Sequence, residues 1–537
     1  MKTIREPSQQ RLFDPFEGVI GPAGWNLIQN GWQSLFRNVI LEQMPVEKIG
    51  QQLSDDAGRP TVELHAILGL LLIRDFHGWT VPQTHEALLF RADVQYALNL
   101  EPGVEITQRT IERYLARLQE NDEISEELFR QVTDSLLRSM EVKVKKQRLD
   151  STHVLSDMAN MGRARMIGVA LRRFLARLEK HDACLLERFS DELLRRYRKS
   201  SDSQVFGDVR STEQRRVALL QAAEDLYAVL TTLAEIQPVC QWDGYRQLEL
   251  IFSQQCELRE EFVEVRRQTG GDVIQNVSDP DATYCGNKGA GYQVQISETF
   301  NEDGEPNLIT GVKVETAVQS DADAVAPILE DLKERDALPD EMLADASYGS
   351  DANVQLADEE GVSLVAPVPG GKKYDAEEVG YDQFELNAAN EVVACPAGHA
   401  PKSTKYNAKT DQVSAQMDAE VCQACPLMAR CRVQKSKAAD GEVPQANGRV
   451  QFRRDAPRAA VRRRHEQTEE FRDRYRWRSG IEATNSTLKR QLGLKRLRVR
   501  GWNAVKTSIL LKLTGWNVLR AVVLRAARSK GPEVALI

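Results

Sequence analysis

A helical pattern runs almost without interruption through residues 160–265, and strand patterns lie on both sides of it. The segment is rich in Arg, Leu and Glu and is too long to be a connecting loop, so we expect it to fold as a helical insertion. The chain must therefore form a sheet-containing core that is interrupted at least once. At 537 residues it is also too long for one hydrophobic core, which predicts three or four domains.

The strand patterns on either side of the insertion outline this core. The first strand, VKVKKQRLDSTHV, is expected to end near Asp150. Four more follow, at 291–298, 308–318, 341–345 and in the stretch VSLVAPV, with a helix over 321–335. Three antiparallel strands, two parallel crossovers and a closing helix make up the layout of a ribonuclease H-like core, which is a mixed α/β sheet.

The region before the core reads as helices joined by short turns. An apolar helix after Thr61 is closed by Gly78. Thr80 caps VPQTHEALLFRADVQYAL, and Thr107 caps QRTIERYLARLQEN. Three compact helices favour a helix-turn-helix-like DNA-binding domain. An ordinary helical bundle that never touches DNA would give the same pattern.

These patterns predict an order of domains along the chain. We expect an N-terminal region at 1–60, an all-α domain at 61–140, a core from 141–160 and 266–370, the helical insertion at 161–265, a cysteine-rich insertion at 371–450, and a closing helix with a basic C-terminal region at 451–537. The cysteine-rich part has no regular pattern, and one strong helix is expected from about Arg458 to Arg490.

Charge is distributed unevenly along the chain. The net charge of −8 by itself argues against a nucleic-acid partner, yet residues 451–530 hold 22 basic and 6 acidic side chains, a net charge of +16. The remaining 457 residues therefore carry −24. This asymmetry predicts one basic surface that faces a polyanion, and a solvated basic helix is the alternative.

Two aspartates are placed where metal ligands are useful. Asp150, followed by Ser-Thr-His, and Asp345, in ADASYGSD, are both expected at strand ends, from which a carboxylate projects off a rigid element. A single such aspartate is more often a turn residue or a cap. Two of them on neighbouring strands favour a metal site.

A third carboxylate lies on the closing helix. Tyr475, Arg478, Glu482 and Lys489 follow a Tyr-x2-Arg-x3-Glu-x6-Lys spacing, which at about 100° per residue puts all four within an arc of about 60°, with Asn485 at its edge. A structural stripe of ion pairs is one interpretation. A stripe of cations with one acid also suits a phosphate backbone beside a metal. Cleavage of a phosphodiester is assisted by two Mg²⁺ ions about 3.5–4 Å apart, and Mg²⁺ prefers hard oxygen ligands.

At this point the chain resembles a known family, the DDE transposases of bacterial insertion sequences. The Tyr-x2-Arg-x3-Glu-x6-Lys motif matches a large branch of them at every fixed position, and RLDSTHV and LADASYGS resemble their first and second aspartate motifs. The helical segment 61–118 also resembles their N-terminal domain. Insertion of the helical block between the first and second strands departs from their most familiar layout, in which the main insertion precedes the glutamate helix.

The resemblance implies roles for these residues. Asp150, Asp345 and Glu482 would be the catalytic triad and would hold two Mg²⁺ ions, while Tyr475, Arg478 and Lys489 would contact transposon-end DNA. The implied reaction is hydrolysis at the ends of the element, followed by attack of the freed 3′-hydroxyl groups on target DNA.

Four of the eight cysteines cluster in the sequence as Cys395, Cys422, Cys425 and Cys431. In a cytosolic chain they are not expected to form disulfides, and the Cys-x2-Cys pair is typical of a metal knuckle. A structural zinc site would order a stretch without an obvious core, and His399 is an alternative ligand. An iron–sulfur cluster and free thiols are the other two interpretations.

Several other polar residues have weaker patterns. His153 is interpreted as a surface or supporting histidine rather than a catalytic one. Asp279, Asp281 and Lys288 precede the second strand, where they would approach DNA or, as Asp-Pro-Asp suggests, simply form a turn. In the C-terminal region, basic residues alternate with apolar ones, and we expect a DNA channel to be lined by Asn485 together with Lys495, Arg496, Arg498 and Arg500.

The sequence thus predicts a magnesium-dependent DNA transposase that acts on double-stranded DNA as a homo-oligomer, most simply a dimer. A metal-stabilised DNA-binding protein without catalysis and a ribonuclease H-like nuclease without strand transfer are the alternatives. The first 14 residues lack an apolar stretch, and the apolar runs are short or interrupted by charges, so we expect a cytoplasmic, nucleoid-associated protein with no membrane contact.

Overall fold

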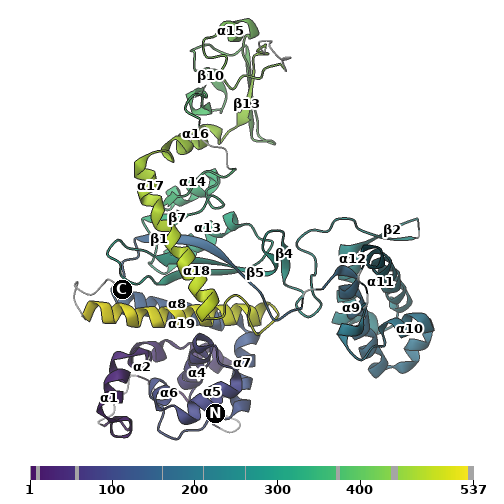
Figure 1. Ribbon diagram of the computed structural model, residues 1–537, viewed down its shortest axis with the longest axis vertical. Helices are drawn as coiled ribbons and strands as arrows, with labels where there is room; N and C mark the ends of the chain where they lie inside the picture. Colours follow the sequence, from purple (N-terminus) through teal and green to yellow (C-terminus); the bar gives the residue numbers. More distant parts are fainter. Residues whose placement is uncertain are drawn as a thin grey trace.

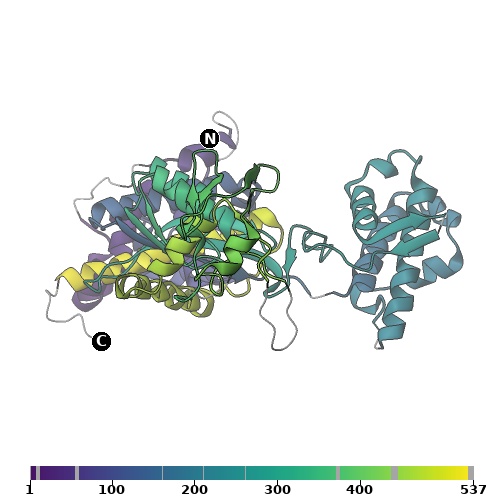
Figure 2. The same ribbon diagram turned by 90° about the horizontal axis from the view of Figure 1, so that it is seen from above.

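The computed structural model of the protein describes residues 2–5, 7, 13–54, 60–159, 161–207, 209, 211–260, 262–370, 375–436 and 445–529. Three lobes surround a central sheet: the N-terminal helices, the helical insertion and the cysteine-containing segment (Figure 1). The view from above shows the insertion set apart from the rest and reached through extended segments (Figure 2).

The central sheet is mixed, as predicted. Along its main path the strands lie in the order β6, β5, β1, β7, β8, with β4 pairing to the first residues of β5. Strand β5 is antiparallel to β1 and β6, whereas β7 is parallel to β1 and β8. The bounds are β1 Lys146–Val154, β4 Thr283–Cys285, β5 Gly289–Thr299, β6 Ile309–Thr316, β7 Glu341–Ala344 and β8 Ser363–Val365. The α/β class is therefore confirmed, and the strand order follows the ribonuclease H-like layout.

Helices cover both faces of the sheet because side chains alternate along each strand. Leu149 of β1 packs among buried residues of α13 (Val325–Glu334) and α14 (Asp351–Glu359). Val154 of the same strand packs among apolar residues of α18 (Gly480–Gln491) and α19 (Trp502–Ser529). The α18 face is the one on which the candidate site lies.

The N-terminal helices form a bundle that is closed by the last helix of the chain. Their bounds are α1 Glu17–Asn30, α2 Trp32–Leu35, α3 Val46–Gln51, α4 Leu64–His77, α5 Val81–Phe90, α6 Ala92–Ala97, α7 Gln108–Glu120 and α8 Asp122–Ser139. The predicted ends at Gly78, Thr80 and Thr107 are confirmed. The stretch predicted as one helix after Thr80 is two, because Arg91 adopts an extended conformation between α5 and α6.

Helix α19 joins this bundle to the sheet. Leu511 and Val518 pack into the N-terminal core, while Leu513 packs into the core beneath the sheet. By length and composition alone α19 would be able to cross a membrane, but 78% of its most apolar window is buried inside the protein. Its apolar character is thus that of a core helix.

The helical insertion has its own hydrophobic core. It consists of α9 Arg163–His181, α10 Asp191–Tyr197, α11 Thr212–Leu233 and α12 Asp243–Gln255, followed by the hairpin of β2 Cys256–Arg259 and β3 Phe262–Val265. Residues of α9, α11 and α12 share one buried cluster that excludes the sheet. The insertion is helical as expected, while its limits as a domain stay a prediction.

The cysteine-containing segment is more regular than the sequence indicates. A three-stranded antiparallel sheet and a cluster that includes Phe384, Val413 and Phe452 give it a hydrophobic core. The elements are β9 Glu385–Leu386, β10 Val392–Ala394, β11 Ser403–Asn407, β12 Gln412–Gln416, α15 Ala419–Ala424 and β13 Arg449–Arg453. The expectation of an irregular stretch without a core was wrong, since the strands are short and pair across a long separation in sequence.

The predicted single helix from Arg458 to Arg490 is interrupted. It is divided into α16 Ala456–His465, α17 Glu469–Tyr475, a 3₁₀ turn Arg476–Ser479 and α18. Thr468 begins α17 by accepting a hydrogen bond from the Phe471 amide, which stops α16 just before it. Phe471 then packs on the sheet beside Phe300 and Leu343, so that tertiary packing fixes the break.

Candidate active site

The register of the sheet brings the two aspartates together. Leu149 of β1 pairs with Ala344 of the parallel strand β7, so the next residues, Asp150 and Asp345, are neighbours. Asp150 does not end its strand as predicted: β1 continues to Val154 through antiparallel pairing with β5. It is β7 that ends here, and the site lies where that strand stops.

Asp345 is held by its own turn. Its Oδ1 accepts a hydrogen bond from the Ser347 amide at 2.7 Å, and the Tyr348 amide donates to its carbonyl at 3.2 Å. This side-chain-to-backbone turn is typical of aspartate after a strand. The side chain is 34% exposed, so its other carboxylate oxygen, Oδ2, is free to face the site.

A buried ion pair fixes α18 over the sheet. Arg148 of β1 and Glu298 of β5 lie 2.6 Å apart with side chains 6% and 1% exposed. Arg148 also donates to the carbonyl of Trp477, and Thr484 of α18 donates to Glu298. At Gly480 a Cβ atom would stand 1.9 Å from Nη1 of Arg148, so only glycine lets the start of α18 come this close.

Arg478 connects all three candidate catalytic carboxylates. Its guanidinium lies 3.0 Å from Asp150, 2.6 Å from Glu482 and 3.9 Å from Asp345. These acids come from β1, from the end of β7 and from α18, which are far apart in the sequence. The three carboxylates therefore converge, and the positive group between them is a side chain of the protein itself.

The electrostatics of the site favour a bound cation. Burial raises the pKa of Asp150 and the neighbouring Asp345 raises it further, against the opposing effect of Arg478. The pKa of Tyr475 is raised first by burial, and the three carboxylates add to this. Tyr475 stacks on Phe471 with ring centroids 5.4 Å apart, which places its phenol at the margin of the site.

Asn485 is buried beside the first aspartate. It is only 7% exposed and its Nδ2 donates to Oδ2 of Asp150 at 3.0 Å. Its contact with DNA stays a prediction. Its position is that of a residue that orients the Asp150 carboxylate from behind.

The other predicted DNA-contacting residues lie along an outer basic rim. Lys489 is half-buried on α18, and the segment that follows the helix presents the exposed side chains of Lys495, Arg496, Arg498 and Arg500. Between these, Leu494 and Leu497 are buried, which explains the alternation in the sequence. Backbone hydrogen bonds from Leu155 and Asp157 hold this segment against the end of β1.

The carboxylates suit a hard divalent cation in their chemistry. Three carboxylates with room for water are the kind of donor set that Mg²⁺ uses. As they lie, however, no three His, Cys, Asp or Glu side chains in the described ranges stand close enough to hold one metal ion. The guanidinium of Arg478 occupies the position between them.

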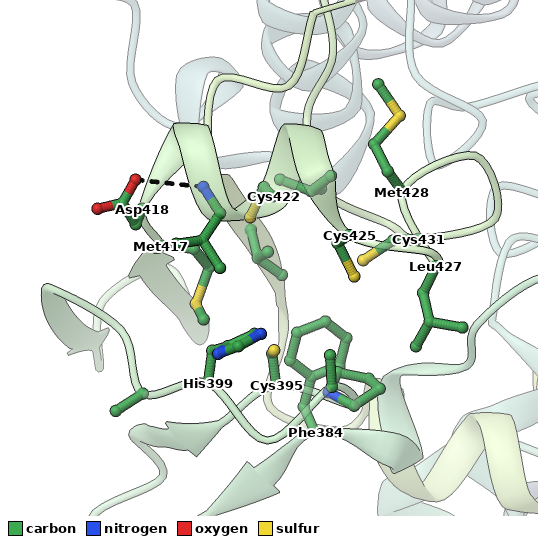
Figure 3. Close-up of a pocket in the computed structure, with 16 residues that line it drawn as sticks. Phe384, Cys395, His399, Met417, Asp418, Cys422, Cys425, Leu427, Met428 and Cys431 are labelled. Carbon is green, nitrogen blue, oxygen red and sulfur yellow. Dashed lines mark hydrogen bonds between the residues drawn. The ribbon is translucent and has the colours of Figure 1, made fainter.

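The four clustered cysteines line one cavity of about 190 Å³ in the cysteine-containing lobe. Figure 3 shows Cys395, Cys422, Cys425 and Cys431 turned toward one another across it, with His399 beside Cys395. The Cys395 loop is tight: its amide donates to the His399 carbonyl and its carbonyl accepts from the Gly398 amide. Apolar side chains such as Phe384 and Leu427 complete the lining.

The thiols influence one another in this cavity. The pKa of Cys422 is raised to about 11, first by burial and then by Cys431, Cys395 and Cys425. The pKa of Cys431 is also raised, first by burial and then by Cys395 and Cys425. Thiolates that repel one another in a buried place are stabilised by a soft divalent cation, so the donor set fits zinc. Among the described residues no three potential ligands stand close enough to hold one metal ion, so these four sulfur atoms would have to move closer together to do so.

Two residues of the site had no signal in the sequence. Nothing in the pattern marked Arg148 and Glu298 as the buried anchor of α18, since each is an ordinary charged residue within a strand. Lys288, for which the sequence left an approach to DNA and a turn both open, reaches Ser151 next to Asp150. In contrast, Asp279 and Asp281 are turn residues as expected, and they accept hydrogen bonds from the amides of Gly501 and Trp502.

The sheet, the converging carboxylates and the basic rim form an arrangement suited to phosphodiester chemistry on a nucleic acid. Residues 394–522 match a family model described as "Transposase DDE domain", which supports a DDE transposase. Such enzymes act on DNA and generally use Mg²⁺. The matched segment contains the four cysteines and Glu482, while Asp150 and Asp345 lie outside it. No curated protein matches the chain.

Proposed function

We propose that the protein is a magnesium-dependent DNA transposase that cleaves the ends of an insertion sequence and joins the freed 3′-hydroxyl groups to target DNA. The observation that carries this proposal is the convergence of Asp150, Asp345 and Glu482 on the guanidinium of Arg478. The match to a transposase DDE domain supports the same conclusion.

In this proposal the three carboxylates hold the metal ions and Asn485 keeps the Asp150 carboxylate turned toward them. Bound Mg²⁺ supplies stabilisation of charge on the attacking and leaving oxygens of the phosphodiester. Arg478, once displaced, and Lys489 bind phosphates that flank the cleavage position. The basic rim formed by Lys495, Arg496, Arg498 and Arg500 continues the DNA path away from the site. Two protomers that bridge two transposon ends are the simplest assembly.

The proposal is tested with Asp150→Asn in the full-length protein. The substrate is a duplex that carries the inverted repeat from the DNA flanking the gene. Strand cleavage in Mg²⁺ should fall on the order of 1000-fold or more, because catalytic groups that act as a unit lose about this much when one is removed. Binding to the duplex should persist.

Asp351→Asn is the matched control. Asp351 pairs with Arg458, and its side chain is 12% exposed, the same as that of Asp150. The Asp351→Asn protein should cleave DNA like the wild type. Wild-type protein that binds but never cleaves would favour the non-catalytic DNA-binding protein, and cleavage without joining would favour a nuclease.

For the cysteine cavity we propose a structural metal site made by Cys395, Cys422, Cys425 and Cys431. Zinc is the expected metal and an iron–sulfur cluster the alternative. Because the lobe has a hydrophobic core, the metal would tighten its loops rather than create the fold. Elemental analysis should find one zinc per chain, and Cys425→Ser should lose it. Visible absorbance with bound iron would select the cluster, and protein free of both metals would leave free thiols.

A further inference from the structure

Lys288 extends from the turn between β4 and β5 toward the catalytic strand. Its Nζ lies 3.2 Å from Oγ of Ser151, the residue after Asp150, and 3.5 Å from Oε1 of Gln293. The hairpin comes this close to β1 because of Gly291, whose φ is +149° and where a Cβ atom would stand 2.5 Å from the Val154 carbonyl. The ammonium group is thus delivered to the mouth of the site by the backbone of the hairpin.

The ammonium group of Lys288 makes only a long ion pair, with Asp321 at 3.9 Å. Lys313 on the neighbouring strand β6 provides a comparison on the same sheet, since its side chain is equally exposed, at 33%, but its Nζ lies 2.6 Å from Glu315. A lysine that served only to fix the hairpin would be expected to make a short ion pair, like that of Lys313 with Glu315.

A second lysine lies one helical turn beyond Asn485, the residue of α18 whose side chain contacts Asp150. Lys489 of α18 forms no ion pair with the acids that the structure describes, and burial followed by the proximity of Lys288 lowers its pKa. The pKa of His153 is lowered by burial and then by both lysines, which places the imidazole near the two of them. Asp150 is the acid that partly offsets this positive charge at Lys489.

We propose that Lys288 and Lys489 together bind one backbone phosphate of the DNA strand beside Asp150, so that Lys288 is a substrate-positioning residue of the active site. Two ammonium groups on opposite elements, one loosely held and one unpaired among the described residues, make a complementary site for a single phosphate. A phosphate between them would relieve their mutual repulsion and replace the weak contacts of Lys288 with charge-assisted hydrogen bonds. This inference rests on the proposed function, because it assumes that DNA runs past Asp150.

The test measures how DNA affinity depends on salt. Full-length Lys288→Ala, Lys288→Arg and Lys313→Ala are compared with the wild type by fluorescence anisotropy, using the inverted-repeat duplex and a random duplex of equal length without Mg²⁺. Loss of one phosphate contact should lower the slope of log K against log salt by about one for Lys288→Ala. Lys288→Arg should keep the wild-type slope, and Lys313→Ala should leave it unchanged.

The outcomes separate this inference from the proposed function. An unchanged slope in Lys288→Ala, whether or not its melting temperature falls, would overturn the phosphate-binding role and leave a structural one. A lower slope in a protein whose wild type never cleaves DNA would support the phosphate site while the transposase proposal fails. With active wild type, Lys288→Ala should also cleave at least about tenfold more slowly, in line with the loss of a group that positions the substrate.

Discussion

The carboxylate site and the cysteine cavity are both candidate metal sites, but they are built in opposite ways. The carboxylates come from three elements that are each more than 130 residues apart in sequence, and they already surround a positive side chain, Arg478. The cysteines come from one short stretch and surround an apolar cavity whose lining includes no Lys or Arg within the described residues. The first arrangement suits an ion that exchanges, and the second an ion that stays.

The physical reason for this difference lies in what each site does without its metal. When no metal is bound, the guanidinium of Arg478 compensates the negative charge of Asp150, Asp345 and Glu482. The thiols have no such internal cation, and they avoid repulsion by staying protonated, as the raised pKa values of Cys422 and Cys431 indicate. A site with an internal counter-ion can release its metal readily, whereas a thiol site must take up protons to do so.

Chelation should produce the greatest change, and an identical response of both sites would refute the contrast between them. Brief treatment with EDTA should abolish DNA cleavage completely, and added Mg²⁺ should restore it in full. The cysteine-bound metal should survive this brief treatment, because four buried thiolates release their ion slowly, whereas prolonged chelation should remove it. Elemental analysis of the treated protein is the measurement, and complete loss of zinc as fast as the loss of Mg²⁺ would show that the two sites exchange their metals alike.

Acidity should distinguish the sites by a smaller, graded effect. With the pKa of Cys422 raised to about 11 and that of Cys431 also raised, these two thiols are protonated between about pH 6 and 8 when no metal is bound, so each must release a proton to bind metal. Zinc affinity should therefore rise by about tenfold per pH unit for every such thiol. The carboxylate site should change in the same direction. Because the pKa of Asp150 is raised, affinity for Mn²⁺ or Mg²⁺ should fall as the pH drops through that raised value.

Competition with a zinc-binding dye and calorimetric titration with Mn²⁺ would measure the two dependences. Zinc affinity that did not change over this neutral range of pH would mean that the thiols are already ionised. Cys422 would then lie in a more polar setting than the cavity provides.

Removal of the internal cation should have the mildest consequence. In Arg478→Gln the carboxylates lose their counter-ion, so the DNA-free protein should bind Mn²⁺ about fivefold more tightly, as expected for a partly exposed ion pair worth up to ~1 kcal/mol. Arg474→Gln is the control, because Arg474 lies on α17, just before Arg478, and pairs with Glu341 of β7 rather than with the triad. Equal Mn²⁺ affinity in Arg478→Gln and wild type would show that Arg478 does not compete with the metal.

Much of the fold was predictable because its signals are local. The caps at Thr80 and Thr107 and the glycine at Gly78 depend on residues within a few positions of one another. The sequence was misleading where distant packing controlled the outcome. The break before Phe471 depends on Phe300 and Leu343, and the sheet of the cysteine-containing lobe depends on pairing between β12 and β13.

Residue types and their spacing were enough to indicate which groups carry the chemistry: Asp150, Asp345 and Glu482 with a basic stripe around the last, and four thiols in metal-like spacing. How these groups meet depends on packing in three dimensions. The parallel register of β1 and β7 sets the two aspartates side by side, the buried pair of Arg148 and Glu298 seats α18 above them, and a hairpin brings in Lys288. Residue identity is a local property, whereas strand register and helix seating come from contacts between segments distant in sequence.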